Sequence, residues 1–263
     1  MKRDRHFFKS AVYAGRLRLR RQPIVESTTQ LPSRFEVLTT IVDGRDRVPA
    51  AEWIEAISHC SESMQLLDLN TVLWVLHEAP STAQYWINLS PLSLQDGYFA
   101  DLLIELIKAS PVDPASLIFE LTEHTPSGPS LRSACERLRE LGCGLAVDDF
   151  GAGYNSALKL LELPFTALKL DGRLCQLAAC NHRAYAVVKA FVAMAQAMKL
   201  AVVAEWVETA TQQQTLAAMG VTLFQGRKFA TPELAWESSH QNLAFPCANS
   251  VAYSADASAY SRS

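Results

Sequence analysis

The sequence GLAVDDFGAGYNSALKLLELPFTALKLD, residues Gly144–Asp171, is the stretch that decides the fold. It begins with an apolar run, Gly144–Val147, that is typical of a buried β-strand and leads directly into Asp148 and Asp149. Side chains alternate between the two faces of a strand, so two adjacent acids can share one site only where the strand ends. The GAG that follows permits a turn, because glycine adopts backbone angles that other residues avoid. We therefore expect both acids to face a common site.

A second strand, which carries a basic side chain, follows this acid pair. A helical stretch, Asn155–Leu163, and a proline lead to an apolar strand, Thr166–Asp171, with Lys169 and Asp171 on one face. A strand ending in acids, a helix and a strand ending in a lysine are typical of a (β/α)8 barrel, whose functional groups gather at the carboxyl ends of its strands. The stretch predicts an α/β fold with a charged site at that rim.

The remainder of the chain repeats the alternation of strand and helix. Strands are expected at Leu17–Val25, Arg34–Ile41, Gln84–Asn88, Ser116–Leu121, Gly144–Val147, Thr166–Leu170, Leu200–Ala204 and Thr222–Phe224. Helices are expected at Ala50–His59, Leu66–Glu78, Phe99–Ala109, Ser130–Leu141, Asn155–Leu163, Arg183–Met198 and Thr211–Ala218. This pattern predicts a closed, mainly parallel barrel. No long helix separates the first two strands, so an all-parallel order is not expected there.

Composition narrows the class of protein. A chain of 263 residues with 49% hydrophobic and 19% charged residues is long enough for one large α/β domain. It has no apolar run of roughly 18 residues that would predict a membrane span. A net charge of -3 gives no case for nucleic-acid binding. The start of the chain lacks a hydrophobic signal core, so we expect a cytoplasmic protein. Its six cysteines have no CxxC spacing, which predicts reduced thiols and not a zinc site.

Three segments are expected along the chain: a basic N-terminal arm over residues 1–15, a barrel domain over 16–232 and a Ser/Ala-rich, largely disordered tail over 233–263. The basic character extends over residues 2–21, which hold eight lysines and arginines and a single acid, Asp4. Charge runs are usually exposed, so a frayed tail leading into a solvated first strand is the expected structure. Contact with acidic lipid or with a partner protein is the alternative.

Charged and polar residues collect at the ends of the predicted strands and, in the case of Glu36, within the second strand. In chain order they are Glu36, Asn88, Glu120, Glu123, Asp148, Asp149, Lys169, Asp171, Glu205, Glu208 and Gln225. A single such acid is more often a helix cap than a ligand, but this many carboxylates at one rim repel each other unless cations neutralise them. Mg²⁺ and Mn²⁺ prefer such oxygen ligands. Two of these ions about 3.5–4 Å apart are the usual machinery for phosphodiester hydrolysis, to which a lysine adds positive charge.

The ordered motifs resemble those of the EAL domain family, the cyclic-di-GMP phosphodiesterases. The motifs are RQPIV, FEVL, INLS, FELTE, DDFGAGYNS, LKLDG, VVAEWVET and FQG, and the resemblance covers roughly Arg16–Pro232. Each motif alone is weak, but the ordered set with matching spacing is specific. The resemblance implies a TIM-type barrel with one strand reversed, which fits the missing first helix. It also implies cyclic di-GMP as ligand, and the chain is expected to be a stand-alone member without an attached sensor domain.

The resemblance implies a role for each matching residue. Two Mg²⁺ or Mn²⁺ ions per active site would be held by Glu36, Asn88, Glu120, Asp148 and Asp149. The catalytic residues would be Lys169, which orients or activates the attacking water, Glu205, which anchors metal-bound water, and Glu36. Ligand contacts would come from Gln22, Asp171, Glu208 and, at the edge of the site, Gln225. The loop residues that order the metal site and contribute to a homodimer surface would be Glu123, Phe150, Gly151 and Gly153.

The sequence departs from the family pattern at Thr40, where an arginine usually grips a ligand phosphate. Loss of such a contact removes on the order of 1.5–3 kcal/mol of binding, unless Arg45 or Arg47 replaces it. Trp206 stands beside Glu205 where glycine is common, which counts only lightly against activity.

Two classes of function therefore remain open. The full set of metal residues favours a phosphodiesterase that converts cyclic di-GMP to pGpG. Thr40 and the basic arm favour the alternative, a catalytically weak or inactive module that acts as a cyclic-di-GMP receptor or binds a regulatory protein. Turnover of cyclic di-GMP would separate the two.

Overall fold

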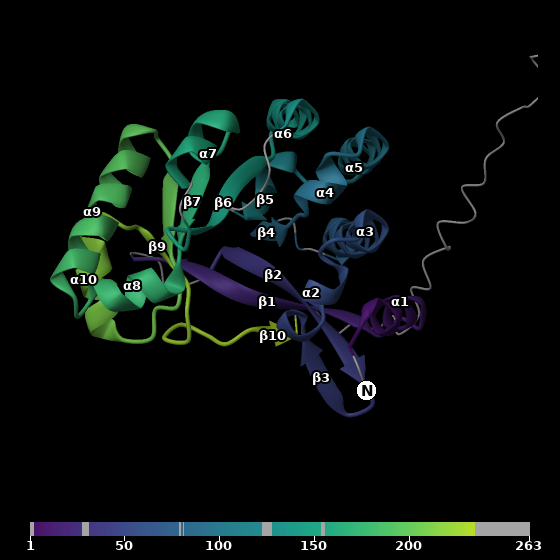
Figure 1. The fold of residues 1–263 in the computed structure, drawn as a ribbon, viewed down its shortest axis with the longest axis horizontal. Coiled ribbons are helices and arrows are strands. Elements are labelled where there is room, and N and C mark those ends of the chain that lie inside the picture. Colours follow the sequence, from purple (N-terminus) through teal and green to yellow (C-terminus); the bar gives the residue numbers. More distant parts are fainter. Residues whose placement is uncertain are drawn as a thin grey trace, which may run out of the picture.

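The computed structural model describes residues 3–27, 32–78, 80, 82–122, 128–153 and 156–234. Its centre is a closed barrel of eight strands (Figure 1). In order around the barrel they are β1 (Leu17–Glu26), β2 (Arg34–Asp43), β4 (Gln84–Asn88), β5 (Leu117–Thr122), β6 (Gly144–Phe150), β7 (Ala167–Leu170), β8 (Ala201–Ala204) and β9 (Leu223–Phe224). The expected strands are all present, with ends shifted by a few residues at most.

One strand of the barrel is reversed, as expected, and it is β1. It runs antiparallel to both of its barrel neighbours, β2 and β9, whereas β2 and β4 to β9 pair in parallel. The reason lies in the connections. Parallel neighbours need a crossover of a dozen or more residues, and too few residues separate β1 from β2 for one. The TIM-type α/β fold predicted from the sequence is therefore confirmed.

Two short strands extend the sheet beyond the barrel and were not expected. β3 (Asp46–Pro49) forms a hairpin with β2, and its two-residue loop uses Gly44 at φ +64°, as tight hairpin turns require. β10 (Glu233–Leu234) pairs antiparallel with β1. The first two residues of the predicted tail are therefore a strand, and the rest of the tail, residues 235–263, lies outside the described residues.

Helices cover most of the circumference of the barrel, whereas β3 and β10 lie beside β1 and β2 (Figure 1). Six of the helices lie close to their predicted positions: α3 (Ser61–Glu78), α5 (Gly97–Ala109), α6 (Pro129–Leu141), α7 (Ser156–Glu162), α9 (His182–Ala197) and α10 (Ala210–Ala218). The predicted helix Ala50–His59 is interrupted: a 3-10 turn (Ala50–Glu52) and a short helix, α2 (Ile54–Ile57), flank Trp53. Two short helices, α4 (Pro91–Leu94) and α8 (Gly172–Ala178), were not predicted. No helix in the described part of the chain is long and apolar enough to cross a membrane.

The expectation of a frayed N-terminal tail is wrong. Arg5–Tyr13 form a helix, α1, which is capped by the carboxylate of Asp4 and lies near α2 (Figure 1). Its apolar face is buried, and Phe8 stacks on Trp53 with 5.2 Å between ring centroids. Burial of this face outweighs the charge of the segment, since each large apolar side chain contributes roughly 1.5–3 kcal/mol. Part of the charge is also balanced, because Lys9 pairs with Glu62 at 2.8 Å.

The interior of the barrel is filled by one layer of mainly apolar side chains. It consists of Ile24, Trp86, Ile118, Ala146, Ala167, Val203 and Leu223. These come from seven of the eight strands, so the barrel is a packed core and not a pore. The layer forms the floor on which the polar site is built.

Candidate active site

The polar site lies directly above the apolar floor because strand side chains repeat with a period of two. On six parallel strands the residue two positions after a floor residue is polar, which gives Asn88, Glu120, Asp148, Lys169, Glu205 and Gln225. On the reversed strand β1 the order is inverted, so Gln22 comes two positions before Ile24. The register of the barrel thereby brings residues far apart in sequence to one rim, as predicted.

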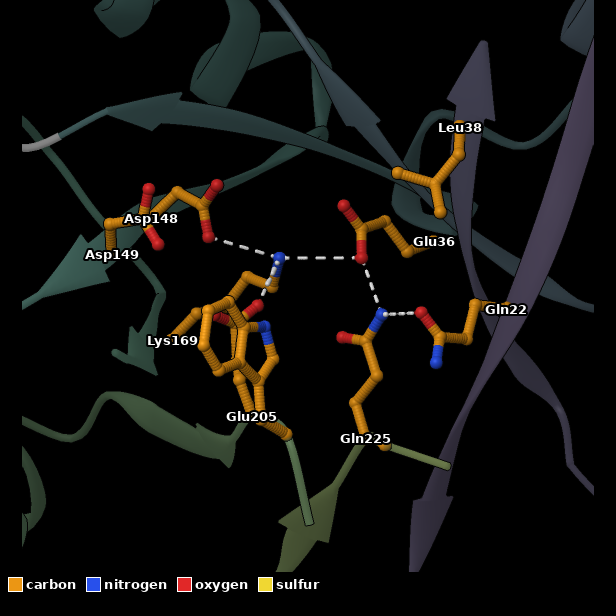
Figure 2. A pocket seen from close by; sticks show the side chains of 10 residues that line it. Gln22, Glu36, Leu38, Asp148, Asp149, Lys169, Glu205 and Gln225 are labelled. Atoms are coloured by element: carbon orange, nitrogen blue, oxygen red, sulfur yellow. Dashed lines mark hydrogen bonds and ion pairs between the residues drawn. The ribbon is translucent and has the colours of Figure 1, made fainter. Parts of the chain in front are cut away.

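Lys169 is the centre of this site (Figure 2). Its side chain is 1% exposed, and Nζ lies 2.8 Å from Glu205, 2.9 Å from Glu120, 3.0 Å from Asp148 and 3.6 Å from Glu36. Burial by itself lowers the pKa of Lys169, but the surrounding carboxylates raise it well above its usual range. Lys169 therefore keeps its proton and acts as a cation and hydrogen-bond donor.

Glu36 is held in one orientation by amide groups. Asn88 Nδ2 donates to Glu36 Oε1 at 3.2 Å, and Gln225 Nε2 donates to Glu36 Oε2. Gln225 Nε2 also donates to Gln22 Oε1 at 3.1 Å, as Figure 2 shows, and Gln22 Nε2 donates to the carbonyl of Ala230. Gln225 is 4% exposed and thus lies inside the site, not at its edge as expected. Since the side-chain amide nitrogen of Asn88 faces Glu36, the side-chain oxygen of Asn88 is left to interact with another group.

The two adjacent acids do face a common site, but through a different device from the one expected. β6 continues through both acids to Phe150, and a bulge shifts its pairing with β7 between Val147 and Phe150. The bulge contains Asp149 at φ +53°, a left-handed conformation that aspartate tolerates better than most residues. One carboxylate oxygen each from Asp148, Asp149 and Glu205 can be chosen so that all three lie within 4.8 Å of one another.

The charge of the site suits divalent cations. Lys169 is the one cation among the described residues that line the pocket, a cavity of ≈ 270 Å³. Burial is the main cause of raised pKa values at three acids of the site. The pKa of Glu120 lies far above its usual range, the pKa of Glu205 is raised to about 8, and the pKa of Asp149 is raised to about 6. Glu120 Oε1 and Gln225 Oε1 are buried acceptors with no hydrogen-bond partner among the described residues. An all-oxygen site with excess negative charge and free acceptors fits hard cations such as Mg²⁺ and Mn²⁺.

Two predicted ligand contacts have other partners. The carboxylate of Asp171 caps α8 by accepting from the backbone N–H of Leu174 at 2.8 Å. Glu208 pairs with Arg227 at 3.4 Å. Neither lines the cavity. Asn88 and Glu120 do not line it either, but they are bonded to the lining residues Glu36 and Lys169 and so belong to the same cluster.

The predicted dimer loop is only partly described. Glu123 lies outside the described residues. Phe150 is fully buried and packs edge-on against Phe191 of α9 at 5.0 Å, so its side chain fixes the start of the loop on α9, and the dimer contact of the loop stays a prediction. Gly151 approaches the same helix closely, since a side chain there would meet Phe191. Gly153 follows as a half-buried residue.

Thr40 is not available to a ligand. It is 1% exposed, and its hydroxyl donates to the carbonyl of Val48 in β3 at 2.9 Å. Arg45 and Arg47 are both exposed on the β2–β3 hairpin. The side chain at position 40 is thus used to close the hairpin against the barrel.

Asp68 supports the site and was missed in the sequence. It is 2% exposed on α3, and its Oδ2 accepts from the backbone N–H of Ser90 at 3.1 Å. Ser90 lies two residues after Asn88, and the intervening Leu89 N–H donates to the carbonyl of Glu120. Asp68 therefore anchors the turn that follows the Asn88 strand. An acid among the apolar residues of the buried helix face was the signal that could have found it.

The buried carboxyl of Asp68 is expected to make the stability of the folded chain depend on pH. Burial raises its pKa from the usual 3.8 to about 7, so between these values the folded chain keeps a proton that the unfolded chain has lost. Its contribution to stability is therefore full below pH 4 and is lost as pH rises to about 7, a difference of about 4 kcal/mol. Asp68→Asn keeps an acceptor for Ser90 and cannot ionise. In urea titrations at pH 8, we expect the Asp68→Asn variant to have a higher free energy of unfolding than the unsubstituted chain. At pH 5 the difference between the two proteins should be smaller. Equal pH slopes for both proteins would contradict this account.

Comparison with known proteins gives the family and the fold. Residues 8–232 match the EAL domain family profile. The cyclic di-GMP phosphodiesterase RocR of Pseudomonas aeruginosa is 38% identical over 148 residues, which are 55% of this chain and 38% of RocR. The structure of PaMucR phosphodiesterase in complex with c-di-GMP is 26% identical, with a TM-score of 0.74 over 88% of this chain and 97% of that chain. An EAL domain protein from Listeria monocytogenes EGD-e, at 23% identity, shares the fold with a TM-score of 0.77 over 86% of this chain and 92% of that chain. The match spans well under half of the length of RocR.

Proposed function

Because this chain belongs to the EAL domain family, we propose that it is a metal-dependent phosphodiesterase that hydrolyses cyclic di-GMP to linear pGpG. The observation that carries the proposal is the cluster at Lys169, whose Nζ lies within 3.6 Å of four carboxylates. Such a cluster is costly to bury and is expected where charge performs a function. RocR, which is named a cyclic di-GMP phosphodiesterase, supports the assignment of the substrate.

The proposed cations are two Mg²⁺ or Mn²⁺ ions. Oxygens of Glu36, Asn88, Glu120, Asp148 and Asp149 would hold them, and Glu205 would act on the side of the pocket next to Asp148 and Asp149. When bound, such ions lower the pKa of water and neutralise charge on the phosphate.

The side chains of this chain would orient the reactants. Water adds to phosphorus, the P–O3′ bond breaks, the 3′ oxygen takes up a proton, and the 5′ phosphate stays on the linear product. Lys169, which keeps its proton, donates N–H groups that can orient the water or stabilise charge on the phosphate. Asn88 and Gln225 donate to Glu36, and Gln22 accepts from Gln225, so the Glu36 carboxylate need not reorganise during the reaction.

We further propose that the protein is cytoplasmic, that it lowers the level of this second messenger as a homodimer, and that it binds a regulatory protein. The match of the DDFGAGYNS loop to the family supports the dimer. Thr40 favours a second candidate, a receptor that binds cyclic di-GMP without efficient turnover, because its hydroxyl is committed to Val48 and grips no phosphate.

The first test is incubation of the purified chain with cyclic di-GMP and Mg²⁺ or Mn²⁺, followed by chromatography for pGpG. Glu36→Ala is expected to lower turnover by at least about 100-fold and to weaken Mn²⁺ binding measured by calorimetry. The variant removes a proposed ligand and takes one acceptor each from the amides of Asn88 and Gln225.

Glu105→Ala is the matched control, because Glu105 is an exposed acid on α5 that pairs with Lys108. Unchanged turnover and unchanged Mn²⁺ binding in Glu36→Ala would show that the site is wrongly assigned. Binding of cyclic di-GMP without pGpG would favour the receptor, and absence of both would contradict the proposal.

A further inference from the structure

Trp206 is an unusual residue at the rim of the pocket. It lines the cavity next to Glu205, yet the residue is 57% exposed. It is also one of three described non-glycine residues with a positive φ, at +52°. A bulky residue in this backbone region costs free energy and persists only where the surrounding structure enforces it. A large exposed apolar ring in a strained position at a binding pocket therefore calls for a functional reason.

The indole of Trp206 rests on a glycine. A Cβ atom built on Gly172 would lie 2.1 Å from Cγ, 2.3 Å from Cδ2 and 2.6 Å from Cδ1 of the indole. Three ring atoms at such similar distances mean that the Cβ direction of Gly172 points into a face of the ring. One face of the indole is thus covered by the start of α8, and the exposed fraction belongs largely to the other face and the edges.

The backbone that carries Trp206 is held to the site itself. The N–H of Val207 donates to the carbonyl of Gln225 at 2.9 Å, and a side chain on Gly226 would collide with the Val207 backbone. Trp206 thus sits between two residues fixed by the pocket, Glu205 and Val207. The indole is a preorganised flat surface whose ordering cost is met before a ligand arrives.

We propose that the free face of Trp206 stacks on a purine base of the bound nucleotide. This inference rests on the proposed function and adds a residue that recognises the base. The cavity of ≈ 270 Å³ is small for a ligand with two nucleosides, since pockets that enclose a drug-sized ligand measure about 300–1,000 Å³. When a phosphodiester occupies the carboxylate cluster, the bases must extend over the rim, where Trp206 lies. Aromatic side chains bind bases there through stacking.

The test compares three substitutions at one position by steady-state hydrolysis of cyclic di-GMP. Trp206→Leu keeps an apolar side chain without a ring, and its KM is expected to rise about tenfold, with kcat changed little. Trp206→Gly relieves the backbone, because glycine adopts φ +52° without strain, so we expect the same rise in KM without loss of Tm. Trp206→Phe retains a ring and is expected to recover most of the affinity.

Tyr98→Leu is the matched control, since Tyr98 is an aromatic residue on α5 that is 91% exposed and does not line the cavity. Stacking is supported if KM depends on whether position 206 carries an aromatic ring and does not correlate with Tm. A merely structural role would instead change Tm and kcat together. Unchanged KM in both Trp206→Leu and Trp206→Gly would overturn the inference while the unsubstituted chain still produces pGpG. Absence of turnover and of binding by the unsubstituted chain would instead overturn the proposed function, and this inference with it.

Discussion

Lys169→Met is expected to abolish turnover and to destabilise the chain when divalent cations are removed. Lys169 Nζ is the nearest positive charge to four carboxylates, at 2.8–3.6 Å. Methionine fills a similar volume but leaves those acids without a counter-charge. Loss of one partner from a buried ion cluster costs roughly 3–5 kcal/mol, and loss of a preorganised donor in a catalytic site lowers kcat by at least about 100-fold. Thermal melts in chelator and pGpG production measure the two effects.

The same variant tests whether the carboxylates bind cations. Mg²⁺ or Mn²⁺ should raise the Tm of Lys169→Met more than the Tm of the unsubstituted chain, because the ions then supply all of the missing positive charge. Loss of turnover should persist in saturating metal, since the N–H donors of the lysine are not replaced. A Lys169→Met protein with unchanged kcat would contradict the role of this residue.

Asp148→Asn is expected to have the second largest effect. The substitution keeps the shape of the side chain and removes one charge from the group formed by Asp148, Asp149 and Glu205. Loss of residues that only support metal ligands costs about 10–100-fold in affinity or activity, so loss of a ligand is expected to cost at least about 100-fold. The measurements are Mn²⁺ affinity by calorimetry and kcat in saturating metal.

A matched acid away from the site controls for the general effect of a lost charge. Asp101 is an exposed residue on α5 that pairs with Arg137 at 2.7 Å. Asp101→Asn should change neither metal affinity nor kcat. Asp148→Asn with the Mn²⁺ affinity of the unsubstituted chain would remove Asp148 from the proposed ligand set.

Much of the barrel was predictable because its signals are local. Apolar runs such as Gly144–Val147 fix the strands, helical stretches fix the crossovers, and the absence of a helix after β1 indicated the reversed strand. The strand ends likewise revealed Glu120, Lys169 and Glu205, whereas Glu36 was identified within the second strand. Periodicity and spacing are properties of the chain itself, so these features need no knowledge of distant contacts.

Other features could not be predicted from the sequence, because they arise from contacts between segments that are distant in the chain. α1 is held by stacking of Phe8 on Trp53, which outweighs a charge run that alone predicts a tail. Asp171 and Lys169 were expected on one face, yet one caps a helix and the other enters the barrel. Asp68 became visible only when its bond to Ser90 across the fold was known.

The sequence by itself thus determined the alternating barrel, its reversed strand and the identity of most residues at its polar rim. Only the tertiary structure decided how those residues meet: that four carboxylates surround Lys169, that Gln225 lies inside the site, and that Trp206 presents one face of its ring beside the pocket. The reason is physical. The period of a strand assigns a side chain to a face, but barrel closure and register set the distances and charges that give the site its chemistry.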